Sequence, residues 1–320
     1  MKALVLLVTV SLSTAAFAFE GTWTASRDDA RNNRIYLQMT RGRSHNMGHA
    51  MSLDAFTGLT DAQIDADTAT PVAFAMRREA GDLNFQGTFR KGEGAGQFTF
   101  TAKPAFLESV RALGVDVDRR KHVRGETQDE LLYALAACDV SVAFIQSMIA
   151  EGYRVTLDDY LTMRIFDITP EFIHEMRDLG FAKISHDELV ACKIHGVTPS
   201  YVRDMREQGW DLSLDDYEAN RIHGVTPEFS AQMRKLGFSD LSRDDLLAFR
   251  IHGVTGEFIH EMRDLGYDLS ADDLISARIH GVTPEFIKEV REAGYAKVPF
   301  NKLLALRMSG FDTRSLGKVY

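Results

Sequence analysis

Cysteine is scarce in this sequence: the 320 residues include two, Cys138 and Cys192, which excludes a fold held together by several disulfides. In an oxidising compartment the two could pair, but their positions in the repeated pattern described below argue against a bond. Cys138 lies two residues before Val140, whereas Cys192 lies five residues before Val197, two repeats later. Adjacent helical repeats stack about 10 Å apart, so the two thiols would be roughly 20 Å apart, beyond disulfide reach. We therefore expect two buried free thiols.

Long apolar runs are missing after residue 18, and none reaches the roughly 18 residues that span a bilayer. We therefore expect no membrane span in the mature chain. The apolar run at residues 3–12 follows Lys2 and precedes Ala16-Phe17-Ala18, an A-x-A cleavage pattern. This arrangement is typical of a secretory signal peptide, and no cysteine follows it to carry a lipid anchor. We predict a signal peptide at residues 1–18 and a soluble, exported protein, periplasmic or secreted.

An excess of basic charge is also missing, since the net charge is −9. Residues 19–103 carry ten acidic and ten basic side chains, whereas residues 104–320 carry 36 acidic and 26 basic ones. An acidic surface repels nucleic acid and anionic lipid, so we expect no nucleic-acid partner.

The second half of the chain contains a repeated phrase, Gly-Val-Thr-Pro-Glu-Phe-Ile. The residue at its second position recurs every 28 or 29 residues, at Val140, Ile168, Val197, Val225, Val254, Val282 and Phe311. A fixed period in the range of about 20–50 residues is the signature of a stacked repeat array, which usually offers an extended binding surface.

Each repeat reads as two short helices, as residues 254–281 illustrate. Thr255 caps the first helix and Gly266 ends it, while Ser270 caps the second with Asp273 as its capping-box partner. The residues expected to be buried are Phe258, Met262 and Leu265 in the first helix, and Leu274 and Ile279 in the second. Neither helix is long enough to be stable alone, so neighbouring repeats must share a core.

The caps recur in register along the chain. The second helix is capped at Thr156, Ser185, Ser213, Ser242 and Ser270, and glycine ends the first helix at Gly152, Gly180, Gly209, Gly237, Gly266 and Gly294. We therefore predict about seven helix-turn-helix repeats over residues 104–320, forming an α-solenoid whose last repeat, from Phe311, is truncated.

Residues 19–103 show a period of two instead, which is typical of half-buried antiparallel strands. Ile35, Leu37 and Met39, for example, alternate with polar neighbours. We predict a small β domain of about five strands, with turns at residues 80–82 and 91–96 that join the last three into a meander. The fold class is thus α+β, with domains at residues 19–103 and 104–320.

The segment after Thr40 is predicted to be a polar loop. His45 and His49 have the H-x3-H spacing that binds a metal on a helix. Gly42 and Gly48 argue against a helix there, so we predict no metal site.

Histidines also form a column in the repeats, directly before the glycine that ends each second helix: His195, His223, His252 and His280. A cation at a helix C-terminus suits the helix dipole. At about 10 Å per repeat, these imidazoles are too far apart to share one metal. We interpret them as structural caps, and a pH-dependent role in binding stays open.

Two segments resemble the start of the zinc-peptidase motif H-E-x-x-H. They begin at His174 and His260, but Asp178 and Asp264 replace the second histidine, so one ligand is missing. We predict no catalytic, cofactor-binding or metal-binding residues, no cofactor, and no enzymatic activity.

Arginines form two further columns: Arg177, Arg206, Arg234, Arg263 and Arg291, and Arg164, Arg221, Arg250, Arg278 and Arg307. We expect these arginines to make ion pairs between repeats with the Asp and Glu residues of the same helices.

The ladder G-V-T-P-E-F-I…M-R-x-L-G-Y…L-S-x-D-D-L…R-I-H-G resembles repeats of exported bacterial proteins, among them the periplasmic tails of BlaR1-type antirepressor peptidases. The segment F-A-M-R-R-E-A-G at residues 74–81, with F-Q-G at 85–87 and G-Q-F-T-F at 96–100, is similar to the β segment that often precedes them. The family's transmembrane helices and H-E-x-x-H domain have no counterpart here, so its proteolytic role does not carry over. The resemblance implies a sensing or interaction module of the cell envelope.

The sequence thus predicts an exported, non-enzymatic module whose acidic repeat surface binds a protein or peptide partner in the envelope. The candidate binding residues are Asp159, Asp216, Asp245, Asp273, His195, His223, His252 and His280, supported by the adjacent acids Asp158, Asp215, Asp244 and Asp272. The alternative is a small-ligand binder or an enzyme with a site where the β domain meets the repeats, near His45, His49 and the charged residues 118–125.

Overall fold

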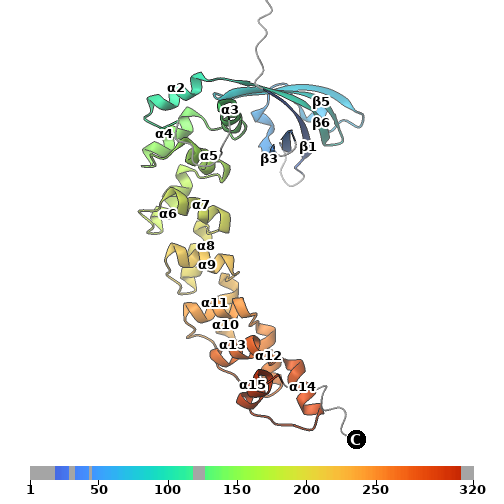
Figure 1. Ribbon diagram of the computed structural model, residues 1–320, viewed down its shortest axis with the longest axis vertical. Helices are drawn as coiled ribbons and strands as arrows, with labels where there is room; N and C mark the ends of the chain where they lie inside the picture. Colours follow the sequence, from blue (N-terminus) through green and yellow to red (C-terminus); the bar gives the residue numbers. More distant parts are fainter. Residues whose placement is uncertain (1–18, 29–32, 43–44, 118–126, 311–320) are drawn as a thin grey trace, which may run out of the picture. The chain divides into compact units, whose positions relative to one another are not determined.

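The computed structural model describes residues 19–28, 33–42, 45–117 and 127–310. The chain divides into two compact units, Met1–Pro170 (unit 1) and Glu171–Tyr320 (unit 2), and each is described by itself. Unit 1 contains a six-stranded antiparallel sheet and the first helices, and unit 2 contains helices (Figure 1). The α+β class is as predicted, and the predicted signal peptide lies outside the described residues.

The sheet of unit 1 has the strand order β3-β2-β1-β6-β5-β4, and every neighbouring pair is antiparallel. Its strands are β1 (Phe19–Arg27), β2 (Arg34–Arg41), β3 (His45–Ser52), β4 (Thr70–Arg77), β5 (Gly81–Arg90) and β6 (Glu93–Ala102). The predicted meander of the last three strands is confirmed. Its second turn is the pair Lys91 and Gly92, both with positive φ, which suits a two-residue hairpin.

The prediction of about five strands and a polar loop after Thr40 is wrong, because residues 45–52 form the edge strand β3. Met47 and Met51 of β3 pair with Met39 and Ile35 of β2. An edge strand is paired on one side only, so its alternation of apolar and polar residues is weak. His49 occupies the inward-facing position between the two methionines, which made the pattern look polar.

Aromatic side chains fill the core beneath the sheet. The rings of Phe74 and Phe85 stack with their centroids 4.7 Å apart, and Trp23, only 1% exposed, packs edge-on against both. The indole fits because Gly96 and Gly87 stand beside it on β6 and β5, and a Cβ at Gly87 would lie 2.7 Å from the ring. Such an aromatic cluster stabilises a small domain mainly through buried area.

Unit 1 also contains the 3₁₀ turn η1 (Leu53–Ala55) and the helices α1 (Asp61–Ile64), α2 (Ala105–Ala112), α3 (Gln128–Ala137), α4 (Val142–Ala150) and α5 (Leu157–Ile165). Helix α3 covers the aromatic face of the sheet, because Tyr133 contacts the rings of Phe19, Phe98 and Phe100. The first helices of the repeat half thus belong to the same compact unit as the sheet.

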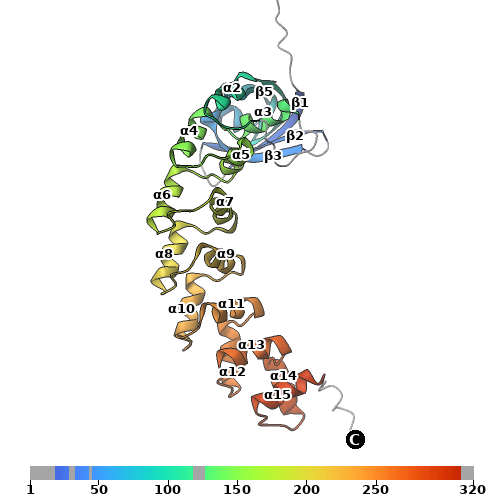
Figure 2. The ribbon, with the colours of Figure 1, turned by 60° about the vertical axis from the view of Figure 1, so that its left-hand side comes forward.

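Helix α6 (Pro170–Asp178) begins at the last residue of unit 1. Unit 2 continues with α7 (His186–His195), α8 (Pro199–Glu207), α9 (Leu214–Ile222), α10 (Pro227–Lys235), α11 (Arg243–His252), α12 (Gly256–Asp264), α13 (Ala271–His280), α14 (Pro284–Glu292) and α15 (Phe300–Met308). Helix α7 packs on α9, α11 on α13 and α13 on α15, while α8 packs on α10 and α12 on α14 (Figure 2). In each of these pairs, a helix packs on its equivalent one period away.

The predicted N-caps are confirmed, but the capping box predicted for Ser270 and Asp273 is wrong, because only the Ser270 hydroxyl takes part in the cap. The hydroxyls of Thr156, Ser185, Ser213, Ser242 and Ser270 each accept a hydrogen bond from the backbone N–H three residues later. The glycines after the first helices all have positive φ, between 83° and 97°. The residues at the second position of the repeated phrase are buried from Val140 to Val282. Phe311 and the predicted truncated last repeat lie outside the described residues.

The prediction that Ile279 buries the second helix is wrong. Leu274 is 1% exposed and Ala277 is fully buried, whereas Ile279 is 53% exposed. At 3.6 residues per turn, a side chain five positions after Leu274 points about 140° away from it. The buried face is therefore completed by the small side chain of Ala277.

In the described part of the chain, no single helix is long and apolar enough to cross a membrane. Helices α3 and α4 meet the length and composition criteria only as a pair, across a bend of 77°.

Candidate interaction surface

In unit 2, the second helix of each repeat carries an exposed aliphatic side chain at the same position. We call these residues the aliphatic column: Ile194, Ile222, Ile251, Ile279 and Met308, which are 51–64% exposed. Ile165 of α5 is the equivalent residue in unit 1 and is 56% exposed. Single exposed aliphatic residues are common on protein surfaces, whereas contiguous apolar patches are typical of interaction sites.

Neighbouring residues on the same helix face widen this column. Residues three and four positions earlier lie beside it on the helix surface. These half-buried residues are Val190 and Ala191, Glu218 and Ala219, Leu247 and Ala248, and Ile275 and Ser276, and they are apolar or small except for Glu218. The aliphatic column is therefore the exposed border of a broader apolar strip.

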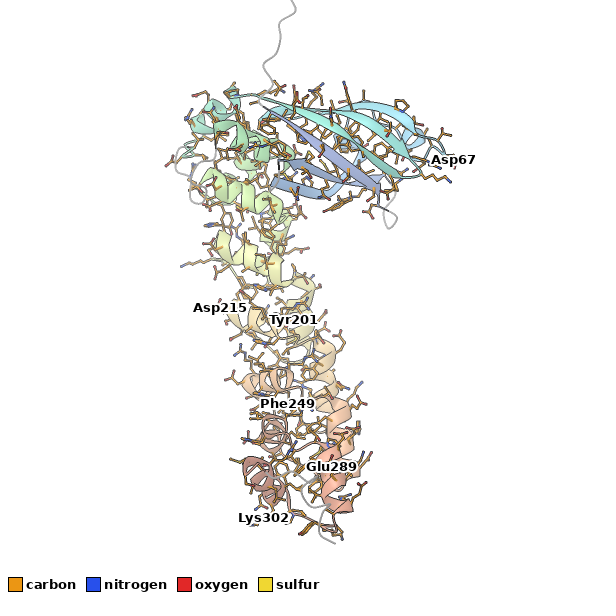
Figure 3. The ribbon with its side chains drawn as sticks, turned by 45° about the vertical axis from the view of Figure 1, so that its right-hand side comes forward. Asp67, Tyr201, Asp215, Phe249, Glu289 and Lys302 are labelled. Atoms are coloured by element: carbon orange, nitrogen blue, oxygen red, sulfur yellow. The ribbon has the colours of Figure 1, made fainter. Side chains whose placement is uncertain are left out.

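Acidic residues lie at the other end of the same helices. We call Asp187, Asp215, Asp244 and Asp272 the acidic edge; all four are exposed, and Asp215 is labelled in Figure 3. Each stands seven residues before a member of the aliphatic column, which is two helical turns and about 10 Å along the axis. The surface thus offers an apolar strip with negative charge along one side.

The predicted binding residues Asp159, Asp216, Asp245 and Asp273 each follow another acid by one position, and their role is different. The Asp159 carboxylate accepts hydrogen bonds from the backbone N–H of Thr156 (3.0 Å) and from its hydroxyl (2.7 Å). Asp245 does the same with Ser242, at 3.1 and 2.6 Å. These carboxylates complete capping boxes, so they stabilise their own helices.

The other two predicted acids also lie at helix starts. Asp216 accepts a hydrogen bond from the Ser213 hydroxyl at 2.7 Å and lies 3.0 Å from a guanidinium nitrogen of Arg243. The backbone N–H of Asp273 donates to the Ser270 hydroxyl at 3.2 Å. Asp215, Asp244 and Asp272 are exposed and the acid after each is half-buried, whereas Asp158 and Asp159 are both half-buried.

The histidine column lies directly beside the aliphatic column. Helices α7, α11 and α13 end at His195, His252 and His280, and His223 is the C-cap residue of α9. Nε2 of His195 lies 3.3 Å from a carboxylate oxygen of Glu218 on α9. The predicted position at the helix C-termini is thus found, but other cations bind the terminal carbonyls.

Those cations are the arginines of the next repeat. Arg221 Nε donates to the carbonyl of His195 at 3.2 Å, and Arg278 Nε donates to that of His252 at 3.1 Å. Each guanidinium also lies over an aromatic ring of the intervening first helix, for example 4.9 Å from the centroid of Tyr201. A guanidinium on an aromatic face gains about 0.5–1 kcal/mol at an exposed site.

The same arrangement recurs along the chain, with ring distances of 4.5–5.4 Å for Arg164 on Phe144, Arg221 on Tyr201, Arg250 on Phe229, Arg278 on Phe258 and Arg307 on Phe286. Lys193 takes this place over Phe172 at 4.4 Å. A Cβ added at Gly196, Gly224 or Gly253 would lie 2.8 Å from the arginine of the next repeat. Glycine at the helix end therefore allows both the positive φ and the arginine.

The second arginine column binds the first helices similarly. Nη2 of Arg263 donates to the Leu236 carbonyl at 2.8 Å, and Arg291 donates to that of Leu265. Arg263 also pairs with Asp268 of its own repeat at 3.0 Å. For Arg263 and Arg291 the contacts between repeats are therefore to carbonyls and rings and not the predicted ion pairs. Arg164 of the first column does form an ion pair between repeats, with Asp139 at 3.4 Å.

Both cysteines are free. Cys192 is buried and Cys138 half-buried, and burial raises the pKa of the Cys192 thiol to about 12 and that of Cys138 to about 11. A thiol with so high a pKa is a poor nucleophile and a poor metal ligand.

In the two segments that resemble a zinc-peptidase motif, Met176 and Met262 are fully buried in the core. Among the described residues, no group of three or more His, Cys, Asp and Glu side chains is placed to hold a metal ion.

The alternative site, where the sheet meets the repeats, is described only in part. The predicted insertion at residues 118–125 lies outside the described residues. His49 Nε2 is 3.1 Å from the carbonyl of Ala137, and burial lowers the pKa of His49 below its usual value. In the described structure, His49 joins strand β3 to the end of α3.

The aliphatic column is the feature that the sequence interpretation missed. The signal was present, because Ile precedes His in four consecutive repeats. Ile279 and Leu274 have the same aliphatic character, and only their angular separation on the helix shows that Ile279 is exposed while Leu274 is buried.

Compared with known proteins, the chain matches no family model, no curated protein and no solved structure.

Proposed function

We propose that this protein is a non-enzymatic interaction or sensing module, exported to the bacterial cell envelope, whose repeats bind a protein or peptide partner. The aliphatic column is the observation that carries the proposal. Fully burying an isoleucine side chain is worth about 1.5–3 kcal/mol, so leaving one exposed in each repeat forgoes stability that a bound partner would restore.

The repeats are proposed to form one continuous solenoid. The constant period of 28 or 29 residues and the packing of α7 on α9 and α11 on α13 support this architecture. Export is proposed from the signal-peptide pattern of residues 1–18, and the resemblance to envelope repeats agrees with it.

The spacing of the column suggests the form of the partner. Packed helices lie about 8–10 Å apart, so successive column residues are separated by about that distance. A partner helix that runs along the column advances about 10 Å in seven residues, which is one heptad. We infer an amphipathic partner helix with an apolar residue in each heptad and basic residues facing the acidic edge.

Affinity capture from an envelope extract of the native host tests this proposal. The baits are the purified protein and the double variant Ile222→Ser/Ile251→Ser. We expect one dominant partner on the unchanged bait. Ile222 and Ile251 are about half exposed, so burying the rest of each is worth about 0.8–1.5 kcal/mol, and the double variant should bind at least about tenfold more weakly.

The matched control is Tyr295→Ser, which removes a large side chain that is 56% exposed but lies outside the column. It should retain the partner, and all three baits should melt at similar temperatures because the changed residues are exposed. Equal capture by the double variant and the unchanged protein would show that the column is not the docking surface.

A further inference from the structure

The sheet of unit 1 has a second face, turned away from the aromatic core, that carries amide and hydroxyl side chains. Strands β1, β6 and β5 are neighbours in the sheet. Their register places Thr22, Gln97 and Gln86 side by side in one row. Glu20, Thr99 and Asn84 form the adjacent row.

These six side chains, together with Gly21 and Phe98, line a hollow of about 610 Å³. A second hollow of about 560 Å³ continues from it over β4, and Asn84 and Gln86 belong to both. Binding sites for small molecules usually measure about 300–1,000 Å³, so each hollow is large enough for a ligand.

The polar side chains of the first hollow do not take part in the hydrogen bonds that hold the described part of the chain together. None of the six makes a side-chain hydrogen bond or ion pair there. An amide group carries two donors and an acceptor, and a hydroxyl both donates and accepts. Asn84, Gln86 and Gln97 thus retain unused hydrogen-bonding capacity in a concave place.

The backbone beneath these amides is held firmly. The indole N–H of Trp23 donates from the core side to the carbonyls of Gln86 (3.2 Å) and Gln97 (3.1 Å). Gly87 and Gly96 follow and precede these residues and let the two strands approach closely. A site that is rigid before binding loses less entropy when a ligand arrives.

The charge of the hollow restricts the ligand further. Glu20 is the only ionisable residue in the lining of the first hollow, and Arg77 lines the second. The first hollow therefore carries no positive charge that would attract an anion. Antiparallel sheets often expose one polar face, and here that face is hollowed and lined mainly by uncharged side chains. Uncharged donors and acceptors around a hollow suit a ligand whose own groups both donate and accept.

We propose that this face of the sheet binds a neutral, polyhydroxylated ligand, namely an oligosaccharide, in a site separate from the aliphatic column. The amides of Gln86, Gln97 and Asn84 bind sugar hydroxyls, and Thr22 and Thr99 contribute further hydrogen bonds. The site is independent of the protein partner proposed above.

Isothermal titration of the purified protein with three hexasaccharides tests the proposal. Maltohexaose and chitohexaose are neutral probes, and a hyaluronan hexasaccharide is the anionic comparison. We expect at least one neutral probe to bind with a Kd below about 1 mM and more tightly than the anionic probe. Gln86→Ala and Gln97→Ala should each weaken that binding at least fivefold.

The matched control is Gln38→Ala, because Gln38 is an amide on β2 that lies outside the lining of both hollows. It should bind the probe as the unchanged protein does, and thermal melts should show that all variants fold. Absence of binding by both neutral probes would overturn the proposal, as would tighter binding of the anionic probe. Equal weakening by Gln38→Ala would overturn the assignment of the site.

Discussion

At the scale of single residues, the arginine before the aliphatic column links one repeat to the next. The side chain of Arg221 lies over the ring of Tyr201, donates to the carbonyl of His195 and fills the space beside Gly196. The carbonyl and the arginine are 26 residues apart, so one side chain joins two consecutive second helices. The terminal carbonyls of a helix need such a partner because no residue of the helix itself can reach them.

We predict that Arg221→Ala lowers the free energy of unfolding of unit 2 by about 1–2 kcal/mol. The change removes a contact between a cation and a ring, worth about 0.5–1 kcal/mol, and a hydrogen bond of similar size. Arg221→Lys should lose less than half as much, because Lys193 occupies this place over Phe172 in another repeat. Urea denaturation followed by circular dichroism measures both.

The control for this series is Lys297→Ala, which removes an exposed cation that lies outside the columns. Its unfolding midpoint should stay at the value of the unchanged protein. If Arg221→Ala behaves like the control, the arginine contacts do not hold the repeats together.

At the scale of elements, helix α3 ties the edge of the sheet to its aromatic face. Its first turn holds Glu130, which accepts a hydrogen bond from the backbone N–H of Thr127 and pairs with Arg41 of β2. Its middle presents Tyr133 to the aromatic rings of β1 and β6, and its last carbonyl meets His49 of β3. The helix therefore contacts strands from both halves of the sheet.

The start of α3 should be sensitive to acid. The hydrogen bond from Thr127 and the pair with Arg41 lower the pKa of Glu130 from 4.5 to about 2. Because this pKa is lowered by folding, the stabilisation is present above pH 4.5 and is lost as the pH falls from 4.5 towards 2. We predict that unit 1 loses stability in this window and that Glu130→Gln, which keeps the capping box, loses less.

The fluorescence of Trp23 reports on unit 1 once Trp210, the other tryptophan, is replaced by Phe in both proteins. Urea denaturation at pH 6, 4 and 3 then gives the free energy of unfolding for the protein with Glu130 and for the variant Glu130→Gln. Parallel pH dependence of the two proteins would show that Glu130 does not contribute.

At the scale of the whole molecule, charge and apolar surface act together in the proposed interaction. The chain carries a net charge of −9, and the imbalance lies in residues 104–320. Capping carboxylates such as Asp159 and Asp245 are engaged in their own helices. The acidic edge is the part of this charge that is most open to a partner.

We predict that affinity for the captured partner falls by about tenfold between about 50 and 500 mM salt, because salt screens exposed charges. The double variant Asp215→Asn/Asp244→Asn should show a flatter salt dependence while keeping the apolar contribution. Biolayer interferometry with the captured partner measures both. An affinity that does not change with salt would remove the acidic edge from the proposal and leave the aliphatic column.

The local features of this fold were readable from the sequence because they depend on neighbouring residues. Helix ends follow from a hydroxyl at the N-cap and a glycine that takes positive φ, so Ser270 and Gly266 marked them correctly. The alternation of Ile35, Leu37 and Met39 marked a strand for the same reason. The repeat period itself is a property of the sequence alone.

Other features were decided only by tertiary structure, because they depend on what lies across from a residue. Strand β3 exists through its pairing with β2, and the arginines donate to carbonyls that lie 25 to 27 residues earlier in the chain. The exposure of Ile279 depends on where the adjacent helices pack, since its aliphatic side chain suits a core equally well. The hollow on the sheet combines β1 with β5 and β6, which only the register of the folded sheet brings side by side.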